Sequence, residues 1–157
     1  MSDYYFGVNS EKQLATIRPF LNKVFRKTLS LGIIDFAVTE GRRLKERQDA
    51  LNLLNPPVTK VEWPNSKHNV NKPDDELTPD DLVGAGDVVP YINGLPSYNP
   101  LICCFLAGLI MTVAKEMLDN GEEGAVPIRW GGNWDRDGEP ITDQKFQDLV
   151  HFEEVIL

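Results

Sequence analysis

Apolar side chains spaced three and four residues apart predict three helices along the chain. They cover residues 10–32, 41–54 and 99–118. The third stretch is the most apolar, so we expect it to be the central core helix. The Pro-Pro pair at 56–57 ends the second helix, because proline cannot continue one.

Alternating or β-branched apolar positions predict strands in the remaining segments. These strands fall at residues 33–39, 87–92, 126–130 and 150–157. A short helix is expected over 143–149, and residues 56–83 have the composition of a loop. Strands and helices follow one another without a steady βαβ rhythm, which favours an α+β fold. A chain of 157 residues is most simply one domain, 1–157.

Composition excludes some classes of protein. The net charge is −8 and the pI is near 4.7, so the overall field repels nucleic acid and anionic membrane surfaces. The longest apolar run, 101–111, is shorter than the roughly 20 residues of a membrane span, and the first residues lack a signal-peptide pattern. We therefore expect a monomeric protein made in a cytoplasm, with no nucleic-acid partner and no membrane insertion. The adjacent Cys103 and Cys104 are expected in the core.

The chain has two histidines, and each stands where a metal ligand is plausible by chemistry. His68, His151 and Asp87 together offer two imidazoles and a carboxylate, the ligand set of a catalytic zinc that keeps one position open for water. Asp148, three residues before His151, is then left as a base for that water. Spacing alone leaves a second interpretation open, in which His68 is a loop histidine and His151 a half-buried strand residue.

Short motifs in collinear order resemble a known family. They are Thr39-Glu40-Gly41-Arg42-Arg43, Ser66-Lys67-His68, Ala85-Gly86-Asp87, Pro90-Tyr91-Ile92-Asn93-Gly94, Arg129-Trp130-Gly131-Gly132-Asn133-Trp134 and Asp148-Leu149-Val150-His151-Phe152-Glu153. This series resembles the D-Ala-D-Ala carboxypeptidase and dipeptidase group of zinc peptidases (the M15 family), and within it the phage endolysins that act as L-alanyl-D-glutamate peptidases. The resemblance implies a Hedgehog/DD-peptidase-like fold, with a small antiparallel sheet packed with helices.

The resemblance also implies roles for individual residues. His68, Asp87 and His151 would bind Zn²⁺, and Asp148 would be the general base and acid. Arg43 would hold a substrate carboxylate or the developing oxyanion, with Arg42 as its rival, and Ser66 would hydrogen-bond the substrate. The alternatives are a solvated charge for Arg43 and a turn cap for Ser66.

The chain departs from the family between the first two ligands. Val83 takes the position of a family glycine, and an extra segment of about 69–82 intervenes. It belongs to the longer loop of residues 56–83, which runs between two proposed ligands, so we expect that loop to form a lid over the site.

Oxygen-bearing side chains alternate in the stretch that starts at Asn133, with Gly138 at the sixth position, as in the first half of an EF-hand loop. The candidate ligands for Ca²⁺ are Asn133, Asp135, Asp137, Glu139 and Asp143. The twelfth position is Gln144 instead of glutamate, so a plain acidic turn is the alternative.

The expected function is that of a phage endolysin-type zinc peptidase, which hydrolyses a peptide bond of the bacterial peptidoglycan stem, most simply L-Ala to D-Glu. The alternatives are a D,D-carboxypeptidase or D-Ala-D-Ala dipeptidase of the same family, and a virion wall-binding protein that keeps the fold without catalysis. The enzyme would collect in the host cytoplasm and reach the wall through a separate membrane pore.

Overall fold

The computed structural model describes residues 3–54, 59 and 61–156. Within these residues the strands form one antiparallel sheet in the order β1-β2-β5-β4, and β3 pairs with the far end of β2. The strands are β1 (Asp35–Glu40), β2 (Ala85–Ile92), β3 (Leu95–Pro96), β4 (Ile128–Gly131) and β5 (Asp148–Glu154). This arrangement confirms the predicted α+β fold with a small antiparallel sheet.

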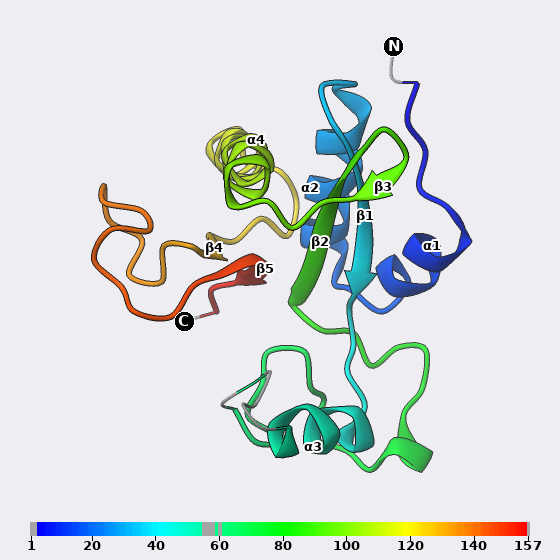
Figure 1. Cartoon of the computed structure of the whole chain (residues 1–157). Coiled ribbons are helices and arrows are strands. Elements are labelled where there is room, and N and C mark those ends of the chain that lie inside the picture. The colour runs from blue at the N-terminus through cyan, green and yellow to red at the C-terminus, as the bar shows by residue number, and fades with distance from the viewer. Residues whose placement is uncertain (1–2, 55–58, 60, 157) are drawn as a thin grey trace.

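Helices α2 (Pro19–Ser30) and α4 (Pro100–Asp119) pack against each other, and α4 also contacts β2, β4 and β5 (Figure 1). Phe25 of α2 meets Phe152 of β5 edge to face, with 6.1 Å between the ring centroids. Helix α4 is the predicted core helix; Cys103 on it is buried, as expected, whereas Cys104 is only half-buried against the core. Among the described helices, α4 alone is long and apolar enough to span a membrane, although part of its surface is buried in this core.

The predicted single helix over 10–32 is wrong, because the chain forms two helices there, α1 (Val8–Leu14) and α2. Proline at position 19 cannot donate a hydrogen bond to the preceding turn and disfavours helical backbone at the residue before it. The intervening residues instead pair with Val83, whose carbonyl accepts from the Arg18 amide at 2.8 Å. Val83, at the family's glycine position, is thus an anchor for the N-terminal helices.

The short helix predicted over 143–149 is also wrong. Residues 148–154 form β5, and the loop before it is held by the side chain of Gln144, whose Nε2 donates to the Gly131 carbonyl at 3.0 Å. Pairing of β5 with β4 therefore outweighs the local helix propensity of this segment.

Helix α3 (Lys45–Leu53) and residues 61–82 lie at one end of the sheet (Figure 1). The segment 69–82, with the short 3₁₀ helix η1 (Asp74–Glu76), packs beside the start of α3, where Asp74 accepts from the Lys45 amide at 2.7 Å. This small lobe faces the end of the sheet at which the candidate site lies.

Candidate metal centre and active site

Three side chains from distant parts of the chain meet at one point. His68 comes from the turn after Ser66, Asp87 from β2 and His151 from β5, where the last two are direct cross-strand neighbours. His68 Nε2, His151 Nδ1 and Asp87 Oδ1 form a triangle with three sides of 3.1 Å. Both histidines are buried. His68 therefore does lie in a loop, as the second interpretation has it, but its ring is buried against the other two side chains.

The hydrogen bonds behind this triangle decide what can occupy it. His68 Nδ1 lies 2.7 Å from the Gly41 carbonyl, and His151 Nε2 lies 3.0 Å from the Glu153 carboxylate. Both partners only accept, so these two nitrogens carry the hydrogens and each ring turns a lone pair toward the triangle. Three lone-pair atoms at 3.1 Å repel one another unless a cation lies among them. Tetrahedral zinc with ligands at about 2.0 Å needs edges of about 3.3 Å, so this donor set fits the metal.

The charges around the triangle favour a cation in the same way. Burial alone would raise the pKa of Asp87, but the two histidines beside it outweigh burial and hold that pKa well below its usual range. Burial alone would lower the pKa of His151, but the carboxylates of Asp87 and Glu153 raise it to about 9. The site therefore stabilises positive charge, which a proton or a metal ion can supply.

Asp148 lies near this group because β5 is irregular. Trp130 pairs with Phe152 and Gly131 with Asp148, so three residues of β5 bulge out opposite one step of β4. In a regular strand, residues three apart point to opposite faces, whereas the bulge lets Asp148 and His151 line one cavity. Burial raises the pKa of Asp148, and the nearby Asp87 carboxylate raises it further. A carboxylate with a raised pKa accepts a proton readily, as a general base must.

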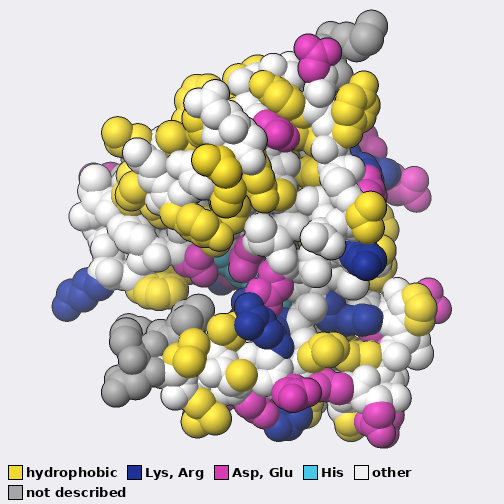
Figure 2. Space-filling model, turned by 45° about the vertical axis from the view of Figure 1, so that its right-hand side comes forward, with side chains coloured by type: hydrophobic (Ala, Val, Ile, Leu, Met, Phe, Trp, Pro, Cys, Tyr) yellow, Lys and Arg dark blue, Asp and Glu magenta, His cyan; other side chains and the backbone are white. Residues whose placement is uncertain are grey.

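The group opens into a cavity of about 610 Å³. One wall comes from Thr59, Val61 and residues 65–68, and the other from β4, β5 and the loop between them. In the space-filling view a histidine is visible at the bottom of a hollow, with acidic and basic side chains around it (Figure 2). Trp134 and Phe146 stack with their ring planes 8° apart, and Trp134 also covers His151 at 5.7 Å between centroids. The cavity thus combines charged groups with one aromatic wall.

Arg43 and Arg42 point to different places. Arg43 lines the cavity, where it pairs with Glu40, donates from Nη1 to Gln48 Oε1 at 2.9 Å and lies 3.9 Å from Asp87. Arg42 instead donates to the carbonyls of Thr78 and Asp81 in the inserted segment. The geometry therefore favours Arg43 over its rival as the residue that faces substrate.

The position of Ser66 agrees with both interpretations of this residue, as a turn cap and as a residue that hydrogen-bonds the substrate. Its hydroxyl accepts from the His68 amide at 3.2 Å, as a turn cap does, and its side chain also lines the cavity. The inserted segment 69–82 does not contribute a residue to the cavity wall. The lid expected from the loop 56–83 is therefore wrong for residues 69–82, which Arg42 and α3 hold beside the site, whereas Thr59, Val61 and residues 65–68 of the same loop line the cavity.

The acidic loop brings together some of the predicted calcium ligands. Carboxylate oxygens of Asp135, Asp137 and Asp143 lie within 4.8 Å of one another, and all three residues are exposed. Asn133 Oδ1 is buried and has no hydrogen-bond partner among the described residues. Glu139 is outside the group, although its amide donates to Asp137 Oδ1 at 2.8 Å. Burial and the neighbouring carboxylates of Asp135 and Asp137 raise the pKa of Asp143.

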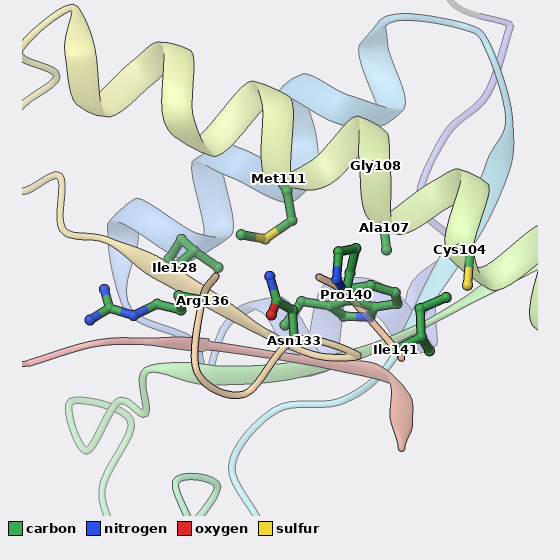
Figure 3. Close-up of a pocket in the computed structure, with 10 residues that line it drawn as sticks. Cys104, Ala107, Gly108, Met111, Ile128, Asn133, Arg136, Pro140 and Ile141 are labelled. Atoms are coloured by element: carbon green, nitrogen blue, oxygen red, sulfur yellow. The ribbon is translucent and has the colours of Figure 1, made fainter. Parts of the chain in front are cut away.

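An apolar cavity of about 380 Å³ separates this loop from α4. Cys104, Ala107, Gly108 and Met111 line it from the helix, and Pro140 and Ile141 line it from the loop (Figure 3). The loop thus rests on an incompletely filled apolar surface and depends on its polar contacts for order.

Several residues of the site escaped the sequence analysis. Glu153 is two residues after His151, and that spacing on a strand places both side chains on one face. Lys67, the middle residue of Ser-x-His, lines the cavity and has no ion pair among the described residues. Gln48, which supports Arg43, is fully buried on α3, and its only sequence signal is a polar residue on an otherwise inward-facing side of a helix.

Comparison with known proteins agrees with this geometry. A family model described as phage L-alanyl-D-glutamate peptidase matches residues 1–155. The chain is 34% identical over 136 residues to the L-alanyl-D-glutamate peptidase of Escherichia phage T5, covering 87% of this chain and 85% of that protein. The crystal structure of the Serratia marcescens L-Ala D-Glu endopeptidase ChiX matches with a TM-score of 0.67 over 98% of this chain and 92% of that chain, and at 21% identity this shows a shared fold. The chain therefore belongs to the phage L-alanyl-D-glutamate peptidase family.

Proposed function

We propose that this protein is a zinc-dependent endolysin that hydrolyses the L-Ala to D-Glu bond of the peptidoglycan stem peptide. The observation that carries the metal is the triangle of three lone-pair atoms from His68, Asp87 and His151 at 3.1 Å. The bond is assigned from the names of the family and of the phage T5 relative.

The residues of the cavity would have the following roles in the reaction. The two histidines and Asp87 would hold the metal, which would supply a Lewis acid for the substrate carbonyl and for the attacking water. Asp148 takes a proton from the attacking water and delivers it to the leaving amine, for which its raised pKa suits it. Arg43 orients the substrate beside Asp87, and Ser66 accepts or donates a hydrogen bond at the cavity wall.

The test is product analysis on purified Gram-negative peptidoglycan, combined with metal analysis. The wild type should hold about one zinc per chain and release fragments with a new N-terminal D-Glu. Asp148→Asn should keep the metal and lose about 100- to 10,000-fold in kcat, as expected for loss of a general base. His68→Ala should lose the metal as well. Release of D-Ala instead would assign the chain to carboxypeptidase chemistry, and undiminished activity of Asp148→Asn would refute the mechanism.

For the acidic loop we propose a calcium site formed by Asn133, Asp135, Asp137 and Asp143, with the Glu139 segment closing the loop. Two observations support it: three carboxylates lie within 4.8 Å, and Asn133 Oδ1 is buried without a partner among the described residues. Calcium should raise the melting temperature of the wild type and not that of Asp137→Asn. Equal melting temperatures of the wild type with calcium and with chelator would contradict a calcium site.

Access to the wall is proposed to depend on a separate membrane pore, with the enzyme acting as a monomer from the host cytoplasm. Expression in a bacterial cytoplasm should then leave cells intact until the inner membrane is permeabilised, and lysis should follow at once. Lysis without permeabilisation would contradict this route. Sedimentation analysis would test the monomer.

A further inference from the structure

Glu153 is in contact with His151 at the nitrogen that faces away from the metal triangle. The two side chains share one face of β5, and Glu153 Oε1 lies 3.0 Å from His151 Nε2. The carboxylate is buried, with the side chain 5% exposed, so this contact is shielded from water. A buried carboxylate accepts and does not donate, so it requires the hydrogen of His151 to be on Nε2.

Arg129 holds the other oxygen of the same carboxylate. Arg129 and Glu153 are cross-strand partners on β4 and β5, and Arg129 Nη2 lies 3.1 Å from Glu153 Oε2. With both oxygens hydrogen-bonded, the Glu153 carboxylate is held in one orientation and in its ionised form. Arg129 therefore stabilises a buried charge that would otherwise be costly.

Arg129 also contacts the residue that covers the face of the His151 ring. Its Nη1 donates to the Trp134 carbonyl at 3.3 Å, and its guanidinium lies 5.5 Å from the centre of the indole ring. Trp134 in turn lies 5.7 Å from the His151 ring. One arginine thus links the group that bonds the edge of the imidazole to the group that covers its face.

From these contacts we propose that Glu153, held by Arg129, is a positioning residue that keeps His151 with Nδ1 toward the metal. The inference rests on the proposed metal site and adds a determinant of metal affinity that lies outside the ligand set. A carboxylate behind a ligating imidazole fixes its tautomer and increases its basicity, and its loss typically costs about 10- to 100-fold in metal affinity.

The next residue provides a matched control. Glu154 is buried to the same extent as Glu153 and also pairs with an arginine, Arg18, at 3.5 Å. It follows Glu153 directly on β5 and contacts neither histidine among the described residues. If Glu153 were only a buried ion-pair member, then Glu153→Gln and Glu154→Gln would have the same effects.

The experiment measures zinc affinity by competition with a chelator for the wild type, Glu153→Gln and Glu154→Gln. We expect a loss of about 10- to 100-fold for Glu153→Gln and no change for Glu154→Gln. The melting temperatures of the two metal-free variants show how much each substitution destabilises the fold. Equal affinities in the two variants would overturn the proposal.

A second measurement uses the wild type and does not depend on the folding of a variant. The chain has only two histidines, so the ¹⁵N spectrum of the imidazoles contains four ring nitrogens. In zinc-loaded protein, and in zinc-free protein at alkaline pH, we expect the hydrogen of His151 on Nε2. A hydrogen on Nδ1 in the zinc-free protein would overturn the proposal. Absence of zinc binding in the wild type, with the hydrogen on Nε2, would refute the proposed metal and support the positioning role.

Discussion

A single methyl group at Gly131 should separate the candidate base from the metal ligands. Gly131 lies in β4 opposite Asp148, and a Cβ built there falls 2.0 Å from the Asp148 carbonyl oxygen. Ordinary contact begins at 3.4 Å, so Gly131→Ala must push that carbonyl back by about 1.4 Å. Because the obstacle is backbone, no side-chain rotation relieves the clash, and β5 itself must move at its bulge.

The size of the effect follows from this displacement. A shift of about 1 Å in a catalytic group can cost about 100-fold in rate, and overpacking of this kind costs about 1–3 kcal/mol of stability. We therefore expect kcat on peptidoglycan fragments to fall about 100-fold, with a lower midpoint in urea. Zinc content should stay near one per chain, because His68 and Asp87 lie on other elements and His151 is held by its own pairing with Asp87 and by Glu153.

The matched control is Gly108→Ala on α4, where an added Cβ meets nothing within 4 Å. Alanine is favoured over glycine in a helix by about 1 kcal/mol, so this variant should be active and slightly more stable. A wild-type kcat in Gly131→Ala would refute the view that the bulge positions Asp148.

Three further predictions concern charge and packing. Zinc must displace the proton of His151, because the pKa of that side chain is raised to about 9. The apparent zinc affinity should therefore rise about tenfold per pH unit up to that pH, with proton release measured by calorimetry. A zinc affinity that does not change with pH would contradict the raised pKa. Lys67→Gln should raise KM for stem peptides about fivefold, as for one exposed ion pair, with kcat unchanged. Lys72→Gln, which removes a charge paired with Asp81 outside the cavity, should leave KM unchanged, and equal effects would contradict a role for Lys67. Phe25→Ala should cost about 3–5 kcal/mol in urea unfolding, because this buried ring supports Phe152, and a loss below about 1 kcal/mol would contradict that support.

The sequence predicted those parts of the fold whose signals are local. The apolar run of α4 and the strands around Asp87 and His151 were identified because periodicity and β-branched residues act within a few positions. The break at Pro19 was missed, since helical spacing continues across it. The helix expected over 143–149 was wrong because long-range pairing with β4 decides that segment.

The site shows the same division between local and long-range information. Its three candidate ligands and Asp148 were predicted from residue type and motif, and the structure brings them together. The bulge that brings Asp148 beside His151 depends on the pairing of β4 with β5, which no local pattern encodes. The destination of segment 69–82 was missed for a similar reason, because it is set by bonds from Arg42 to distant carbonyls.

The position of β5 within the sheet has a consequence for the timing of activity during synthesis. This strand is made after the other four, yet it lies between β2 and β4 and carries both His151 and Asp148. A partly synthesised chain that lacks β5 holds only His68 and Asp87 of the proposed site, with an open edge where β5 belongs. One proposed ligand and the proposed base are therefore acquired together, when β5 pairs with its neighbours, and a chain without β5 should be inactive.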